Sequence, residues 1–302
     1  MFHSWVPFLF LCGFVAAAPL TESLLDARAS DTKYLFFFGD SYTKLGFSFS
    51  SNLPSAANPI GNPAFPATSS SGGENWVEFL TATYNRSLTL TYDIAVGGAT
   101  VESSLIPPAV ETVDLGGQLS TWEKDAEQHE RTGAWDADNS LFLLWFAVND
   151  VNQGFNLTSD QDSLYEQDMT IYFDHAISLY DRGAKNFVFL NCPPIHRSPV
   201  VRGYPSSDRS EEEAAETVFN SKLQDYVQRF RESHNVNAHL VDTVGPFNEA
   251  LNNPKKYGAP DATCANTDGT SCLWFDHLHP GVAIQKLVAE KVASDVTTFF
   301  TT

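Results

Sequence analysis

Short apolar runs alternate with longer amphipathic segments along most of the chain. Each run is too short for an ordinary helix and suits a strand that is buried on both faces. Strands of this kind alternating with helices predict a parallel α/β sheet. The five predicted strands cover residues 33–38, 90–96, 140–147, 185–191 and 237–241.

The segments between these runs repeat apolar residues at the spacing of a helix face. In the fourth of them, Phe219, Leu223 and Phe230 fall on one side, which indicates packing against the sheet rather than a ligand groove. The predicted helices cover residues 75–84, 117–130, 163–182, 210–234 and 281–300.

Residues 48–73 interrupt this pattern with a stretch dense in Ser, Pro, Asn, Ala and Gly. A loop of that length inside a compact domain is usually either functional or disordered. Because it closely follows the first predicted strand, we expect it to form a rim of a substrate cleft. A disordered segment is the alternative.

The first predicted strand stops at Gly39, Asp40 and Ser41. Glycine permits a sharp turn, and Asp or Ser can cap a following helix. Such a turn would lift Ser41 above the edge of the sheet, where its hydroxyl could act as a nucleophile and its backbone N–H could face an anion. An ordinary turn with a helix cap is the alternative, and the tripeptide alone does not distinguish the two.

The N-terminus carries an apolar stretch at residues 5–17 that ends in small residues. This pattern predicts a signal peptide over residues 1–17, followed by a propeptide or loose N-terminus at 18–30 and a single domain at 31–302. The first residues include no Lys or Arg, so a buried N-terminal segment is the alternative. No later apolar run is long enough to span a bilayer, and we expect a secreted protein without a membrane span.

The four cysteines fit a secreted chain. Cys12 would leave with the signal peptide, and Cys264 and Cys272 close a short polar loop, which favours a disulfide in an oxidising compartment. Cys192 follows an apolar run and is expected to be a buried thiol rather than a reactive one. No Cys/His spacing resembles a zinc site, and we expect neither a metal nor a cofactor.

The net charge limits which partners the protein can bind, and two sequence triplets predict glycosylation. The formal net charge is −19 and the isoelectric point is near 4.6, so the surface should repel nucleic acid and anionic lipid and suit uncharged substrates. Asn85 and Asn156 begin Asn-x-Ser/Thr triplets and would be glycosylated in a eukaryotic host. With 302 residues and 43% hydrophobic content, the chain can bury a sizeable core.

Open α/β sheets bind ligands at the carboxyl ends of their strands. Partners of Ser41 are therefore expected where the other predicted strands end. Gly97 and Gly98 follow the second strand, where a glycine lets a backbone N–H approach a substrate oxygen. Asn149 follows the third, where its amide could face a developing oxyanion. Ordinary turns or a helix cap are the alternatives at these positions.

Asp276 and His279 lie just before the last predicted helix. An Asp three residues before a His can fold back, so that its carboxylate accepts the Nδ1 proton and Nε2 is left free to deprotonate Ser41. A solvated loop is the alternative reading of this pair. The neighbouring His277 leaves open which imidazole matters.

Taken together, these segments resemble the GDSL-type, or SGNH, hydrolase superfamily in order and in approximate spacing, from about residue 33 to the final helix. The resemblance implies a three-layer α/β/α sandwich with a flavodoxin-like five-stranded parallel sheet and helices on both faces. It also implies that Ser41 is the nucleophile, that Asp276 and His279 are the acid and base, and that Ser41, Gly97 and Asn149 form the oxyanion hole.

Two positions depart from the family pattern. Ala147 replaces a glycine two residues before Asn149, and Asp93 replaces an asparagine at the start of the second block. The hydrogen bonds that the asparagine would donate are therefore in question. Neither departure touches a residue that performs the chemistry.

The opening at residues 37–42 and the segment 75–80 look like fungal acetyl esterases of carbohydrate esterase family 16. This resemblance implies removal of acetyl groups from plant cell-wall oligosaccharides by a protein that we expect to be a monomer. Trp274 is a candidate to stack on a sugar face, although a core position is an equally good reading. A lipase or phospholipase acting on longer acyl esters is the first alternative, and a non-catalytic carbohydrate-binding wall protein is the second.

Overall fold

The structure is a computed structural model that describes residues 1, 31–67, 69–126 and 134–302. The predicted signal peptide and propeptide therefore lie outside the described residues, apart from Met1. No helix within the described part of the chain is both long and apolar enough to cross a membrane.

A parallel sheet forms the centre of the molecule, with strand order β2-β1-β3-β4-β5. This is the order of flavodoxin-like sheets, in which ligands bind at the carboxyl ends beside the first strand. The parallel sheet and its flavodoxin-like order are both confirmed. The strands are β1 (Lys33–Gly39), β2 (Thr89–Asp93), β3 (Ser140–Trp145), β4 (Asn186–Leu190) and β5 (Asn237–Val241).

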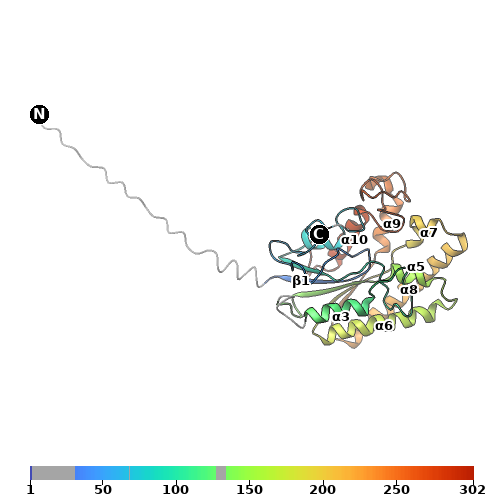
Figure 1. The fold of residues 1–302 in the computed structure, drawn as a ribbon, viewed down its shortest axis with the longest axis horizontal. Helices are drawn as coiled ribbons and strands as arrows, with labels where there is room; N and C mark the ends of the chain where they lie inside the picture. Colours follow the sequence, from blue (N-terminus) through green and yellow to red (C-terminus); the bar gives the residue numbers. More distant parts are fainter. Residues whose placement is uncertain (2–30, 68, 127–133) are drawn as a thin grey trace.

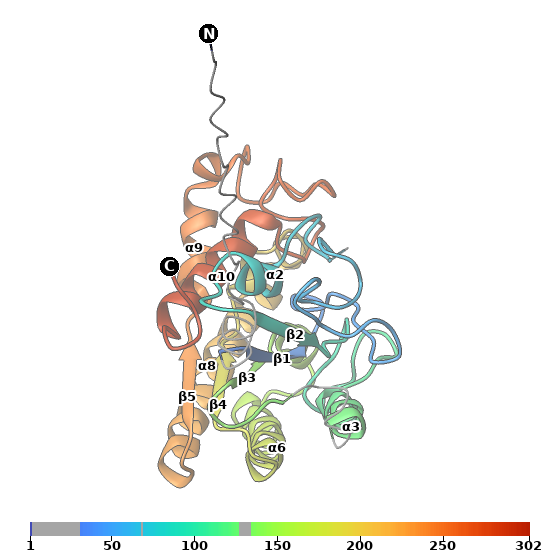
Figure 2. The same cartoon turned by 90° about the vertical axis from the view of Figure 1, so that its left-hand side faces the viewer.

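Helices cover both faces of the sheet, as the three-layer prediction requires. In Figures 1 and 2, α3, α6 and α8 lie on one face, and α2, α9 and α10 lie on the other. The helices are α2 (Trp76–Ala82), α3 (Leu115–Ala126), α5 (Val148–Gly154), α6 (Gln161–Asp181), α7 (Pro199–Arg202), α8 (Ser206–Ser233), α9 (Val244–Asn252) and α10 (Val282–Asp295), with short 3-10 helices η1 (Ile195–Arg197) and η2 (Pro254–Tyr257).

Strand β1 is buried on both faces because its side chains alternate between the two helical layers. The Phe36 ring lies 5.8 Å from that of Trp122 on α3, whereas the Phe37 ring lies 5.0 Å from that of Trp76 on α2. Residues 35–38 are fully buried. This double packing fixes the strand whose end carries Ser41.

Several predicted element ends differ from the structure by two to five residues. The second strand stops at Asp93 rather than at residue 96, although the N–H groups of Ile94 and Val96 still donate to carbonyls of β1. The predicted helix 281–300 ends at Asp295. Helices α5 and α9 were not predicted, because each follows a strand end at once and is only seven or nine residues long.

The loop at residues 48–73 has a structural role at the sheet edge. Thr91 of β2 donates its N–H to the Pro59 carbonyl at 2.9 Å, so the loop covers the outer edge of the sheet. Its first residues line a hollow together with residues 94–96, and the rim of a substrate cleft stays a prediction.

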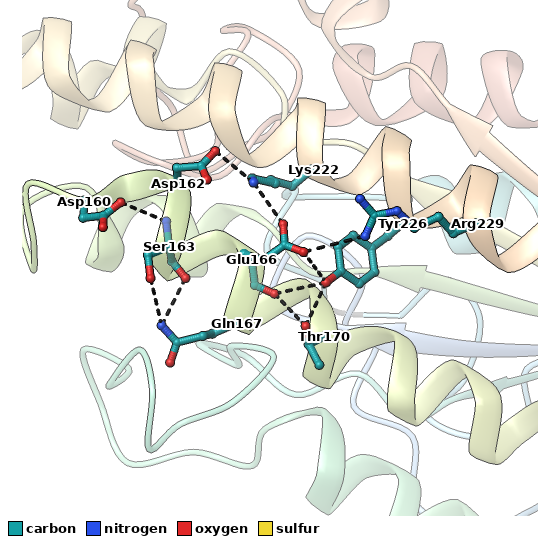
Figure 3. A network of polar contacts seen from close by, with 9 residues as sticks. All are labelled: Asp160, Asp162, Ser163, Glu166, Gln167, Thr170, Lys222, Tyr226 and Arg229. Carbon is teal, nitrogen blue, oxygen red and sulfur yellow. Dashed lines mark hydrogen bonds and ion pairs between the residues drawn. The ribbon is translucent and has the colours of Figure 1, made fainter.

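A charged network joins α6 to α8 (Figure 3). Lys222 of α8 lies 2.8 Å from Asp162 and 2.9 Å from Glu166 of α6, and the Tyr226 hydroxyl donates to Glu166 at 2.7 Å. These bonds hold the two longest helices together at the surface. They contribute no group to the site described next.

Candidate active site

Ser41 and His279 meet although 238 positions separate them in the chain. The Ser41 Oγ lies 2.8 Å from Nε2 of His279, and Nδ1 of the same ring lies 2.7 Å from Oδ2 of Asp276. With the ring proton on Nδ1, the carboxylate accepts that proton and Nε2 can accept one from the serine. The predicted triad is thus assembled within hydrogen-bonding distance.

The Asp276–His279 turn is held by its own carboxylate. Asp276 Oδ1 accepts the N–H groups of Leu278 and His279, each at 2.8 Å. Partial burial alone would raise the pKa of Asp276, but these bonds and the His279 ring outweigh it and lower the pKa to about 2. The Tyr42 hydroxyl donates to the Leu278 carbonyl at 2.7 Å, which ties the turn to the segment after Ser41.

The tight turn before Ser41 requires glycine and a buried carboxylate. A Cβ on Gly39 would lie 2.8 Å from the Trp145 carbonyl oxygen, so no larger residue fits. Asp40 is buried and accepts the Tyr42 N–H at 2.8 Å. Burial raises the pKa of Asp40 to about 7, against the lowering effect of that N–H, His279 and Asn149. Asp40 therefore shapes the turn, whereas Asp276 is the carboxylate that contacts His279.

Asn149 comes to the same place from the first turn of α5. Its Nδ2 donates to Asp40 Oδ2 at 3.1 Å and to the Ala99 carbonyl at 3.0 Å. Ala147, which replaces the family glycine, is fully buried and caps α5 without a side-chain bond. The structure thus brings Asn149 to the serine turn, with its amide hydrogens directed to acceptors of the protein. Donation to an oxyanion stays a prediction.

Gly97 lies directly beside Ser41. A Cβ built on Gly97 would lie 3.8 Å from Ser41 Cβ and 4.0 Å from Lys44 Nζ. The Gly97 carbonyl accepts from the Thr112 hydroxyl at 2.7 Å, and Gly98 has a φ of +80°, which favours glycine. The residues around Gly97 are therefore held close to Ser41. Donation of the Gly97 N–H to an oxyanion remains a prediction.

Asp93, which stands where the family has an asparagine, accepts hydrogen bonds from two segments next to Ser41 and Gly97. Its buried carboxylate accepts N–H bonds from Leu45, after the serine turn, and from Ala95, before Gly97. Burial raises the pKa of Asp93 to about 8, despite these bonds and the nearby Lys44. The position thus joins the nucleophile segment to the Gly97 loop by accepting hydrogen bonds rather than by donating them.

The structure settles two positions that the sequence left open. Trp274 is fully buried, and its Nε1 donates to the Ala262 carbonyl at 2.9 Å, so the prediction that it stacks on a sugar is wrong. His277 is exposed, and its carbonyl accepts the Val200 N–H, whereas His279 makes the bond to Ser41.

The cysteines follow the prediction. Cys264 and Cys272 form a disulfide, and Cys192 is a buried free thiol whose pKa burial raises well above its usual value. Asn156 is exposed, whereas Asn85 is half-buried and its side-chain amide donates to the Ser87 carbonyl. Glycosylation at both positions stays a prediction.

A serine, histidine and aspartate linked in this order can carry out acyl transfer through a covalent serine ester. A sheet with this strand order, bearing such a triad at its carboxyl edge, defines a serine hydrolase of the three-layer α/β class. Residues 35–292 match the family described as "GDSL-like Lipase/Acylhydrolase". The chain belongs to this family of carboxylic ester hydrolases, and the predicted resemblance is confirmed.

Two relatives of similar length agree with the family assignment, and one solved structure agrees with the fold. A protein named "Acetylesterase" from Thermothelomyces thermophilus is 45% identical over 271 residues, which cover 88% of this chain and 89% of that protein. A second "Acetylesterase", from Hypocrea jecorina, is 23% identical and covers 91% of this chain and 92% of its own length. The solved structure of LAE5, an alpha/beta hydrolase enzyme from the metagenome of Lake Arreo, Spain, matches with a TM-score of 0.52 and 17% identity over 88% of this chain and 95% of that one.

Proposed function

We propose that this protein is a secreted acetylesterase that removes acetyl groups from plant cell-wall oligosaccharides, such as acetylated xylo- or manno-oligosaccharides. The observation that carries the hydrolase chemistry is the linked triad, with 2.8 Å between Ser41 Oγ and His279 Nε2 and 2.7 Å between His279 Nδ1 and Asp276. The acetyl specificity is supported by the 45% identity to a fungal acetylesterase over most of both chains.

In the proposed reaction, His279 takes the Ser41 proton as the serine oxygen attacks the ester carbonyl. The resulting oxyanion receives hydrogen bonds from the N–H groups of Ser41 and Gly97 and from the Asn149 amide. Collapse breaks the bond to the sugar oxygen, which takes the proton from His279 and leaves an acetyl ester on Ser41. Water then attacks that ester with the same proton transfers and releases acetate.

A lipase acting on longer acyl esters is the second candidate, and one observation favours it. Val110 and Val113 are 62% and 42% exposed, and Val110 packs against Gly98 of the predicted oxyanion loop. Exposed apolar side chains beside an ester site suit an acyl chain. The two candidates share the triad and differ only in what surrounds it.

Substrate comparison separates these candidates. We expect kcat/KM to be highest for acetylated xylo-oligosaccharides, lower for a long-chain p-nitrophenyl ester and lowest for phospholipid vesicles. The Ser41→Ala protein serves as the blank for contaminating esterases. A clear preference for long acyl chains would replace the acetylesterase proposal with the lipase one and leave the triad intact.

Secretion is tested on the protein made by its own host. We expect N-terminal sequencing of protein from the culture medium to begin after residue 17. Glycosidase treatment should lower its mass if Asn85 or Asn156 carries glycan. Retention of residues 1–17 on intracellular protein would contradict the proposal.

A further inference from the structure

We propose that a hollow beside the Gly97 loop binds a sugar unit of the alcohol half of the ester. This inference rests on the proposed function and adds a specific subsite to it. The hollow has a volume of about 320 Å³ and lies between the end of β2, the start of the 48–73 loop and helix α3. Its walls include Phe47, Val96 and Thr121.

Two walls of the hollow are hydrogen-bonded to Gly39, at the start of the Ser41 turn. Val96, in one wall, donates its N–H to the Gly39 carbonyl at 3.0 Å. Gln118, in another wall, accepts the Gly39 N–H at 3.0 Å and donates to the Gly39 carbonyl at 2.8 Å. Gly39 lies two positions before Ser41, and Gly97 directly follows Val96. In this proposal, a substrate whose ester lies at Ser41 extends past Gly97 into the hollow.

The chemistry of the lining suits a sugar. One side is apolar and includes Val113 and the half-buried ring of Phe47. The polar groups of the lining are the hydroxyls of Ser48, Ser50 and Thr121 and the carboxylate of Asp125. The C–H face of a sugar ring can pack on an aromatic ring while its hydroxyls bond to such groups. The Ser48 and Ser50 hydroxyls bond to each other and the Thr121 hydroxyl donates to the Gly117 carbonyl, so their remaining acceptor positions are left for sugar hydroxyls.

Phe47 is held in place before any ligand arrives. Its ring makes edge contacts with Phe49 at 4.9 Å and with Tyr92 at 5.8 Å. A side chain already fixed by its neighbours loses little conformational freedom on binding. Phe47 is thus a half-buried aromatic residue in the wall of the hollow, whereas Trp274 is fully buried.

The proposal is tested with two variants of the hollow and one matched control. Phe47→Ala removes the aromatic wall, and Thr121→Trp fills the hollow from an exposed position of α3 without disturbing the core. Phe65→Ala is the control, because Phe65 is also an aromatic residue of the nearby loop, 43% exposed, but does not line the hollow. Steady-state kinetics are measured with an acetylated xylotetraose and with p-nitrophenyl acetate.

We expect both hollow variants to raise KM for the oligosaccharide by about fivefold or more, with less than about twofold change for p-nitrophenyl acetate. Phe65→Ala should match the wild type on both substrates. Equal losses on both substrates, or an unchanged KM for the oligosaccharide with Thr121→Trp, would overturn the proposal. A loss confined to long-chain acyl esters would overturn it as well, because the hollow would then hold the acyl chain.

Direct binding provides a readout that does not depend on turnover. Unacetylated xylotetraose is titrated into the Ser41→Ala protein by calorimetry, with and without Thr121→Trp. We expect weaker binding when the hollow is filled, and equal affinities would contradict the subsite. If the wild type cleaves p-nitrophenyl acetate but not the oligosaccharide, the proposed function itself fails; if it cleaves both and the variants behave as wild type, only the subsite fails.

Discussion

The amide of Asn149 donates a hydrogen bond of 3.1 Å to the buried carboxylate of Asp40. The residue directly before the nucleophile and the predicted oxyanion donor are therefore linked. Asp40 also accepts the Tyr42 N–H, so one carboxylate fixes both the serine turn and the position of the amide. Asp40 acts as a positioning residue in this arrangement.

Replacing Asp40 by Asn should break that link and preserve the turn. The new side-chain oxygen can still accept the Tyr42 N–H, but its amide would face the Asn149 amide, donor against donor. We expect kcat for p-nitrophenyl acetate to fall about ten- to a hundredfold with KM little changed, because small displacements of catalytic groups are costly. Asn149→Ala alone should cost about 10²–10³ in kcat.

The double variant distinguishes positioning from an independent role of Asp40. If Asp40 acts through Asn149, the Asp40→Asn/Asn149→Ala protein should be no slower than Asn149→Ala. Fully additive losses would show that Asp40 contributes separately. Thermal melts of all three proteins monitor folding.

An added methyl group should lower stability at Gly39 and lower activity, but not stability, at Gly97. In Gly39→Ala the Cβ would meet the Trp145 carbonyl oxygen at 2.8 Å, whereas the nearest atom to a Gly97 Cβ is 3.7 Å away. We expect Gly39→Ala to lower stability by about 1–3 kcal/mol through overpacking. Gly97→Ala should melt like the wild type and lose activity, since its methyl group lies beside Ser41. Chemical denaturation and kcat/KM of both variants check this, and equal stabilities would contradict it.

Asp276→Asn should remove most activity without unfolding the protein. An amide next to Nδ1 favours the tautomer with the proton on Nε2, which cannot accept the Ser41 proton. We expect kcat to fall by about 10³–10⁴. Asp268→Asn is the matched control, because Asp268 also closes an exposed turn by accepting two backbone N–H groups but does not touch His279.

The Asp276 carboxylate also predicts a pH dependence. Its pKa in the folded chain is about 2, below the unfolded value near 4, so its stabilising effect is present above pH 4 and lost only as the pH falls towards 2. Protonation of Asp276 should therefore not limit kcat above about pH 3. A rate profile is the check, and an activity loss near pH 4 that is absent from Asp276→Asn would contradict this.

Glu212 of α8 should make the protein less stable as the pH rises. The side chain is buried, neither carboxylate oxygen has a hydrogen-bond partner among the described residues, and burial together with Glu216 raises its pKa to about 8. Between about pH 4 and pH 8 the unfolded chain releases a proton that the folded chain retains, so the free energy of unfolding falls.

The measurement is urea denaturation at pH 5 and pH 8. Each unit of pKa difference is worth about 1.4 kcal/mol, so Glu212→Gln should reduce the fall in unfolding free energy between these pH values by about 1 kcal/mol or more. Glu211→Gln, an exposed neighbour on the same helix, should leave the fall unchanged. An equal fall in unfolding free energy between pH 5 and pH 8 for the two variants would contradict the raised pKa of Glu212.

The sequence predicted the sheet because β1, β3 and β4 are nearly continuous apolar runs that end at turn residues. Strand β1 shows this most clearly, since residues 35–38 are fully buried and Gly39 stops the run. The triad was predictable because Asp276 and His279 are close in sequence and their turn is local. Only the pairing of that turn with Ser41 depends on the fold.

Other features depend on contacts that a local pattern does not contain. Trp274 reads equally well as a sugar platform or a core residue, and only the surrounding chain decides that it is buried. The acceptor role of Asp93 depends on Leu45 and Ala95 coming together. The prediction for β2 ran three residues too far, because residues 94–96 are apolar and still form hydrogen bonds with β1 after the strand ends. The hollow near Phe47 arises from three separate segments.

Ser41 should act as the nucleophile, activated by His279. Peptide mapping by mass spectrometry after treatment with a fluorophosphonate, which reacts with activated serines, tests it most directly. We expect a single modification on Ser41, full inactivation in step with labelling, and no labelling in His279→Ala. Modification of another serine that accounts for the loss of activity, or an unlabelled Ser41 in an inactivated protein, would contradict the account.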